Sequence, residues 1–273
     1  MAVVRLESAL WRTTSLLLVG GGEAVAIDPG VSRAEVAAIE AGARARGAVV
    51  THVLATHADW DHVCGIAAFP DAVAAMGQLT GDIVVSGAPA DVIERRAAEH
   101  AISVAGAPRV DRVLQAGAAC QIGPFTIETF SLAGHTPDGT AFRVRMLDLL
   151  AVGDHLSAVE FPFVSSTAAY RASLAGLIEL LRHDPPGQIY PGHGPPLTVT
   201  EAVAIAEADL AYLRSLHDEV ATSLVEGGAI ADARAAGLAV SLPREAPPDL
   251  AGAHAENVEA QLEELLPMRD VTA

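Results

Sequence analysis

The pattern of apolar and polar positions in the N-terminal part of the chain predicts strands around one helix. Apolar runs at residues 16–19 and 24–27 flank three glycines, which predicts a β-hairpin. Residues 49–56 form an apolar run that predicts a buried strand. Between them, residues 33–46 carry apolar side chains at the spacings of three and four that an amphipathic helix requires: Val36, Ile39 and Ala43. The chain is therefore expected to open in β-β-α-β order.

The middle of the chain has a weaker pattern, in which short apolar runs alternate with glycines. Residues 71–75 and 83–85 are predicted as strands, and residues 90–100 as a helix. Four more strand-like runs follow: residues 112–114, 125–129, 141–144 and 149–152.

Helical periodicity dominates the C-terminal part. Residues 170–181 place leucine and isoleucine on one face, which predicts a helix, and a short strand is expected at residues 188–190. Residues 200–224 predict one long helix and residues 257–265 another.

The chain has 273 residues, enough for one large domain with an extension. Strand-like runs end before residue 197, and the sequence beyond it is helical in pattern. We therefore expect an α/β domain over residues 1–197 and a helical C-terminal extension over residues 198–273.

Composition narrows the classes of partner. The formal charge of −17, with arginine as the only basic side chain apart from histidine, argues against nucleic acid and anionic membranes. No apolar run of eighteen or more residues lacks a charged or polar break, and no basic leader precedes the first apolar run. Cys64 and Cys120 are too few for a disulfide framework. We expect a cytoplasmic protein with a small-molecule substrate; its oligomeric state stays open.

Metal-binding side chains cluster directly after the predicted strand at residues 49–56. Histidine nitrogen and carboxylate oxygen are the ligands that zinc, iron and manganese accept from proteins. Four of them lie within six residues: His57, Asp59, Asp61 and His62. Three later turns, each framed by glycine or proline, follow strand-like runs and present one more such side chain each: His135, Asp154 and His193.

Five elements together resemble the metallo-β-lactamase superfamily: Asp28-Pro29-Gly30, residues 56–62, Gly134-His135-Thr136-Pro137, Gly153-Asp154, and Pro191-Gly192-His193-Gly194. The resemblance covers residues 16–197. It implies an αββα sandwich with a two-metal site at the sheet edge, here followed by the C-terminal helical extension. That extension and the turn at residues 191–195 resemble the glyoxalase II-like branch, which hydrolyses thioesters and related acyl compounds.

The resemblance also implies which side chains bind metal and what they do. Seven positions match the superfamily's ligands: His57, Asp59 and His135 for a first metal, Asp61, His62 and His193 for a second, and Asp154 as a bridge. Two divalent ions about 3.5–4 Å apart would share a water and lower its pKa until it is hydroxide at neutral pH. The hydroxide would attack a carbonyl carbon, and Asp61, as the catalytic residue, would orient it or pass on its proton.

Two positions depart from the superfamily pattern. The H-x-H-x-D-H motif is H-x-D-x-D-H here, with Asp59 in place of the second histidine. A carboxylate hardens the site, so the expected zinc faces competition from iron or manganese. Asp59 could also lie near the metal without binding it, which would leave a one-metal site. Asp138 stands where the G-H-T-P-G turn usually has glycine and adds another carboxylate.

The leading hypothesis is a metal-dependent hydrolase that uses a metal-bridging hydroxide on a small acyl substrate such as a thioester or lactone. Asp59 motivates an alternative, a diiron oxidoreductase, because the flavodiiron proteins have H-x-E-x-D-H at this place. The chain lacks room for the flavodoxin-like domain of that branch. A third hypothesis is a binding module with a degraded metal site.

Two other side chains near the cluster, Cys64 and Trp60, have two interpretations each. Cys64 is either a thiolate ligand or redox residue or, as its type favours, a small buried residue. Trp60 either forms an apolar pocket wall or packs in the core. His52 has the opposite parity to His57 on the predicted strand and is expected to face away. His155 is expected to support or pack instead of binding metal.

Overall fold

The computed structural model describes residues 1–245, 250 and 252–272, and in it the chain divides into two compact units. Unit 1 comprises Met1–Leu132, Asp138–Asp154 and Pro186–Leu197. Unit 2 comprises Ala133–Pro137, His155–Pro185 and Thr198–Ala273. One junction between the units falls between residues 197 and 198, where the helical extension is expected to begin; the division into two domains at that point stays a prediction.

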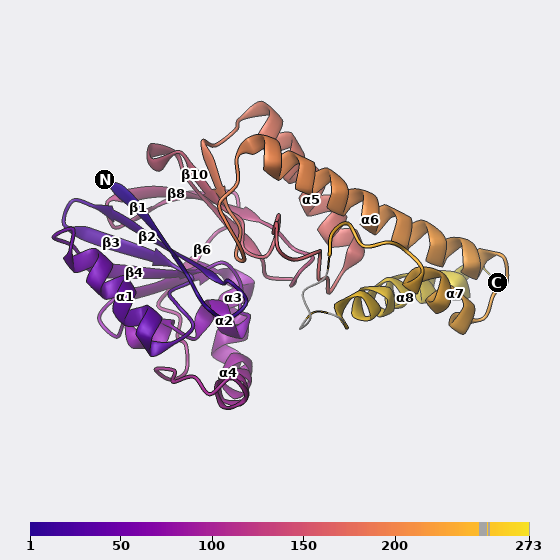
Figure 1. Ribbon diagram of the computed structural model, residues 1–273, viewed down its shortest axis with the longest axis horizontal. Helices are drawn as coiled ribbons and strands as arrows, with labels where there is room; N and C mark the ends of the chain where they lie inside the picture. Colours follow the sequence, from indigo (N-terminus) through magenta and orange to yellow (C-terminus); the bar gives the residue numbers. More distant parts are fainter. Residues whose placement is uncertain (246–249, 251, 273) are drawn as a thin grey trace. The chain divides into compact units, whose positions relative to one another are not determined.

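The first sheet of unit 1 has six strands among the described residues, arranged in chain order. Its first three strands are antiparallel neighbours and the last four are parallel. The strands are β1 (Ala2–Glu7), β2 (Thr14–Gly20), β3 (Glu23–Ile27), β4 (Val49–Ala55), β5 (Val73–Gly77) and β6 (Arg112–Leu114) (Figure 1). The predicted hairpin is confirmed as β2 and β3. The sequence did not predict β1, which is only half-buried along its length.

The second sheet also belongs to unit 1 and has the order β11-β10-β9-β8-β7. All neighbours in it are antiparallel except β10 and β11, which are parallel. Its strands are β7 (Ala119–Ile122), β8 (Phe125–Ser131), β9 (Thr140–Val144), β10 (Leu149–Ala151) and β11 (Gln188–Tyr190). All but β7 were predicted; β7 is a largely exposed strand at the edge of the sheet and lacks a buried run.

Two apolar cores hold unit 1 together, and β2 contributes to both. Leu16 and Leu18 pack in the core that joins the two sheets, with Phe125 and Phe142. Leu17 faces the other core, which also takes residues from the helices. This alternation follows from the two-residue period of a strand. A helix–sheet–sheet arrangement results, and with the C-terminal helices it confirms the predicted α/β class with two sheets.

Unit 1 has four helices among its described residues, and the first and third of them pack against strands of the first sheet. They are α1 (Arg33–Arg44), α2 (Trp60–Val63), α3 (Gln78–Ser86) and α4 (Ala88–Glu99), with 3-10 turns at Ile66–Ala68 and Arg145–Leu147. Ser32 begins α1 with a capping box to Glu35, so this helix starts where its sequence indicates. The predicted strand at residues 83–85 is wrong, because these residues lie in α3. Val84 is buried and Val85 is exposed, as on a one-sided helix.

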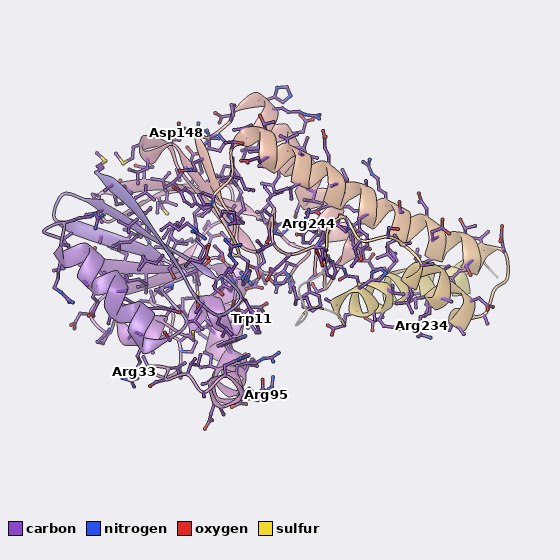
Figure 2. All side chains as sticks on the ribbon, viewed as in Figure 1. Trp11, Arg33, Arg95, Asp148, Arg234 and Arg244 are labelled. Atoms are coloured by element: carbon purple, nitrogen blue, oxygen red, sulfur yellow. The ribbon has the colours of Figure 1, made fainter. Side chains whose placement is uncertain are left out.

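Unit 2 consists mainly of four helices in its described residues: α5 (Thr167–His183), α6 (Val199–Val225), α7 (Ile230–Leu238) and α8 (Ala253–Thr272). The long helix α6 packs against the other three (Figure 1). Arg244 pairs with the buried Asp209 of α6, and Arg234 of α7 pairs with Glu259 of α8 (Figure 2). The predicted helices α5, α6 and α8 are confirmed, each longer than expected. None of the helices in the described part of the chain is both long and apolar enough to cross a membrane.

Candidate metal centre

The side chains of the centre project from the carboxyl ends of parallel strands in unit 1. Asp28 follows β3 and His57 follows β4, and these two strands are parallel neighbours. Asp154 follows β10 and His193 follows β11, which also run parallel. Parallel neighbours end at the same edge of a sheet, so residues far apart in sequence come together there.

A first group of side chains contains His57, Asp59 and Asp154, with ligand atoms within 4.8 Å of one another. His57 Nε2 lies 3.6 Å from Asp59 Oδ2 and 3.5 Å from Asp154 Oδ2. The His57 side chain is 2% exposed, whereas that of Asp59 is 43% exposed. Asp59 is therefore the more weakly enclosed member of this group.

A second group contains Asp61, His62 and His193, all buried and also within 4.8 Å. Asp61 Oδ2 lies 3.5 Å from His62 Nε2 and 3.6 Å from His193 Nε2. Asp154 Oδ1 lies 3.1 Å from His62 Nε2, and its Oδ2 lies 3.2 Å from His193 Nε2. Asp154 thus faces both groups.

His135 belongs to unit 2, in the short segment Ala133–Pro137. Its ring lies against Phe163, and its Nδ1 lies 2.7 Å from the Phe163 carbonyl oxygen. That contact fixes the ring through Nδ1 and leaves Nε2 as the nitrogen suited to a ligand. Its assignment to the first metal stays a prediction.

Asp28 and Thr56 hold the rings of two histidines, and neither was predicted as a functional residue. Asp28 Oδ2 lies 2.9 Å from His62 Nδ1 and accepts a hydrogen bond of 2.8 Å from Thr56 Oγ1. Because the Thr56 hydroxyl donates its hydrogen to Asp28, its oxygen accepts from His57 Nδ1, 3.0 Å away. The sequence signal was the Asp28-Pro29-Gly30 turn, whose role for the histidines only the tertiary structure shows.

The loop between β1 and β2 supports the second group, and no motif in the sequence indicated this. The Trp11 carbonyl oxygen lies 2.9 Å from His193 Nδ1. Thr13 Oγ1 donates a 3.0 Å hydrogen bond to Asp61 Oδ2. Trp11 and Arg12 both have positive φ, of 52° and 58°, so this loop holds a strained backbone where it meets the site.

The donor set fits metal cations. Each Nδ1 of His57, His62 and His193 faces an acceptor and so carries the ring hydrogen. In the neutral ring, Nε2 then carries a lone pair and no hydrogen. Each of these Nε2 atoms nevertheless faces carboxylate oxygens at 3.1–3.6 Å. Lone pairs and carboxylates repel one another unless positive charge lies between them. Imidazole nitrogen with carboxylate oxygen is the donor chemistry of zinc, iron and manganese.

The pKa values of two histidines express the same demand for positive charge. Burial lowers the pKa of His62, but Asp154, Asp61 and Asp28 outweigh it and hold the pKa well above its usual range. Burial and the charge of His62 lower the pKa of His57, whereas Asp154 and Asp59 raise it to a net increase. A proton or a metal ion can supply the charge, so the two compete.

Residues 9–193 match the family described as the metallo-beta-lactamase superfamily. The chain belongs to this superfamily. It is also 28% identical over 155 residues to a hydroxyacylglutathione hydrolase of Jannaschia sp. (strain CCS1). That match covers 57% of this chain and 52% of the relative, so the chain spans about half the length of the curated relative it matches.

Solved structures of the superfamily share the fold at low sequence identity. ETHE1 from Myxococcus xanthus has a TM-score of 0.58 and 18% identity, covering 79% of this chain and 91% of that one. BLEG-1 B3 metallo-beta-lactamase has a TM-score of 0.57 and 21% identity, covering 73% of this chain and 95% of that one. TTHA1623 in a di-iron-bound form has a TM-score of 0.57 and 23% identity, covering 73% of this chain and 96% of that one. At these identities the likeness shows the metallo-β-lactamase fold alone.

Gly192 is required by the close packing at this superfamily site. A Cβ atom there would lie 2.1 Å from Asp154 Oδ1 and 3.0 Å from His62 Cε1. The Pro191-Gly192-His193-Gly194 turn therefore serves two purposes: it presents His193, and it leaves room for Asp154.

Cys64 and Trp60, which had two interpretations each, both pack in a core of unit 1. Cys64 is 1% exposed within the core, and burial raises the pKa of its thiol, so it is a small buried residue. Trp60 is 6% exposed and packs edge-on against Trp11 at 5.4 Å between ring centroids. His155 stacks on Tyr170 in unit 2 at 4.3 Å between centroids. His52 contacts the Thr51 hydroxyl and is in neither metal-binding group.

Proposed function

We propose that this protein is a metal-dependent hydrolase that acts on a small acyl substrate such as a thioester or a lactone. One observation carries the proposal: six histidine and aspartate side chains form two adjoining groups, with Asp154 facing both. The hydroxyacylglutathione hydrolase relative supports the choice of an acyl substrate, at 28% identity over part of its length.

The proposed ligands are divided as the groups suggest. His57, Asp59 and Asp154 would hold the first metal, and Asp61, His62 and His193 the second, with Asp154 shared. His135 would complete the first metal's ligands. Chain connectivity supports this role, since His135 is three residues from both Leu132 and Asp138 in unit 1 and cannot lie farther than roughly 10 Å from either.

When bound, two divalent metals would supply a hydroxide nucleophile at neutral pH and polarise the substrate carbonyl. The protein's own residues prepare this chemistry. Asp61 carries a carboxylate oxygen held by Thr13 and lies between His62 and His193, so it can orient the nucleophile or take its proton. Asp28, Thr56 and the Trp11 carbonyl fix the ring orientations before substrate arrives.

An assay against a panel of thioesters and lactones tests the proposal. Protein supplied with zinc, iron or manganese is expected to hydrolyse at least one of these compounds. His135→Ala and His193→Ala should each abolish turnover, whereas His183→Ala, in an exposed part of α5, should not. Metal-loaded wild-type protein with no turnover on the whole panel would exclude the proposed reaction.

Asp59 favours a second candidate, a diiron oxidoreductase. Its carboxylate lies in the first group and makes that half of the centre richer in oxygen ligands, which suits iron. TTHA1623, a structural relative, is described in a di-iron-bound form. Protein purified without oxygen and without added metal should then contain two irons and consume oxygen; zinc together with hydrolysis would exclude this candidate. Asp59→His is expected to shift metal preference toward zinc, and unchanged metal content would mean that Asp59 is not a ligand.

A further inference from the structure

Asp138, the additional carboxylate that the sequence places near the centre, is hydrogen-bonded to the turn that carries His57 and Asp59. Its Oδ2 accepts a 2.8 Å hydrogen bond from the backbone N–H of Ala58. Ala58 stands between His57 and Asp59, so this bond fixes the peptide that joins two proposed ligands of the first metal. Hydrogen bonds to ionised carboxylates are stronger than those between neutral groups.

The backbone around Asp138 is itself held firmly. The hydroxyls of Thr80 and Thr140 both donate to the Asp138 carbonyl oxygen, each at 3.2 Å. Thr140 N–H donates a 2.8 Å bond to the Thr56 carbonyl oxygen. Residues 138–140 therefore hold the chain on both sides of His57, once through the backbone and once through the Asp138 side chain.

The second oxygen of Asp138 is unusual. Asp138 is 5% exposed, and its Oδ1 is buried without a hydrogen-bond partner among the described residues. A buried carboxylate oxygen without a donor costs free energy, so packing alone does not account for an acid here. The side-chain oxygen that accepts from Ala58 does account for a polar residue at this position.

We propose that Asp138 is a positioning residue for the first metal, which aims Asp59 through the Ala58 amide. Asp59 needs this help more than His57 does, because its side chain is 43% exposed whereas His57 is buried and held by Thr56. The inference rests on the metal centre of the proposed function, and it concerns metal binding, not substrate.

A double-mutant cycle on metal affinity tests the inference. The affinities of metal-free protein for Zn²⁺ and Mn²⁺ are measured by competition with a chromophoric chelator, in wild-type, Asp138→Ala, Asp59→Ala and the double variant. With either metal, Asp138→Ala should weaken the binding of one of the two ions per chain by about 10- to 100-fold and leave the binding of the other ion unchanged. In the Asp59→Ala background, the same substitution should change affinity by no more than about twofold.

Two further variants separate positioning from folding. Asp138→Asn keeps an oxygen for the Ala58 N–H and should retain most of the affinity. Asp111→Ala removes a similar 2.8 Å bond, which the Ala74 N–H donates to Asp111 Oδ2, far from the centre in sequence and outside both metal-binding groups. It should leave both affinities unchanged, even if it lowers the melting temperature as much as Asp138→Ala does.

The outcomes separate this inference from the proposed function. Equal losses from Asp138→Ala with and without Asp59, or equal weakening of both ions, would overturn the positioning role. If the wild type binds two ions and hydrolyses an acyl substrate while Asp138→Ala binds as tightly, only this inference fails. If the wild type binds none of Zn²⁺, Mn²⁺ and Fe²⁺, the proposed function fails with it.

Discussion

His62 Nδ1 lies 2.9 Å from Asp28 Oδ2, and the same oxygen receives the Thr56 hydroxyl at 2.8 Å. Through Thr56, whose oxygen accepts from His57, one buried carboxylate therefore orients a histidine in each of the two groups. Asp28 Oδ1 accepts a third hydrogen bond, from the Thr56 backbone N–H. The two halves of the centre share this support, so we expect a change at Asp28 to affect both proposed metals.

Asp28→Asn should weaken metal binding about 10- to 100-fold for both ions. An asparagine offers one oxygen where three donors now bind, so at least one donor faces an NH₂ group. Thr56→Val provides a matched comparison, because it removes the contact to His57 and leaves that of His62; it should weaken one ion more than the other. Chelator competition measures both effects, and unchanged affinity in Asp28→Asn would contradict the role of this carboxylate.

Thr13→Val should affect the second group alone. The valine has nearly the same shape but cannot donate to Asp61 Oδ2, which Thr13 now contacts at 3.0 Å. We expect about tenfold weaker binding of one ion and a lower kcat on any substrate found. Thr13→Ser keeps the hydroxyl and serves as the control; equal behaviour of the two variants would show that the hydrogen bond has no effect on the centre.

Stability should depend on pH in opposite ways with and without metal. In the metal-free protein the pKa of His62 is raised from 6.5 by Asp154, Asp61 and Asp28, against the effect of burial. Its protonation therefore stabilises the fold below pH 6.5, and this contribution is lost as pH rises through the raised value. Metal must displace the proton, so metal affinity should rise over the same interval.

Melting temperatures of chelator-treated and metal-loaded protein between pH 6 and 9 measure this difference. The gap between the two should widen as pH increases. A constant gap across that range would mean that no proton is displaced from these histidines.

Gly192→Ala should disrupt the centre through crowding. The added Cβ would lie 2.1 Å from Asp154 Oδ1, so the shared carboxylate must move. We expect fewer than two metals per chain by elemental analysis and a loss of about 1–3 kcal/mol in the free energy of unfolding. Gly176→Ala is the control, because its added Cβ would meet nothing within 4 Å beyond the backbone of its own helix, and it stands exposed in α5. It should be neutral or slightly stabilising.

The sequence predicted the strands and helices whose side chains are clearly one-sided or fully buried. Strand β4 and helix α1 follow directly from periodicity. Strands β1 and β7 were not predicted, because neither is fully buried. Residues 83–85 looked like a strand because three branched apolar residues are adjacent there. The helix prevails because Gly77 and Gly87 bound it and because only Val84 of the three is buried.

Ligand candidates were readable from sequence because their types and turns carry the chemistry themselves. Their supports were not. Thr13, Thr56 and the Trp11 carbonyl are ordinary groups whose role depends on a partner up to 182 residues away. The hydrogen bond between Asp138 and Ala58 likewise joins residues 80 positions apart, so spacing along the chain could not indicate it.

We propose that bound metal makes this protein a hydrolase of small acyl compounds. The most direct test follows thioester and lactone hydrolysis while metal-free protein is titrated with zinc, iron or manganese. We expect no turnover before addition and a rate that rises to a plateau at two ions per chain. Hydrolysis that is already complete in the metal-free protein, or no hydrolysis after two ions have bound, would contradict the proposal.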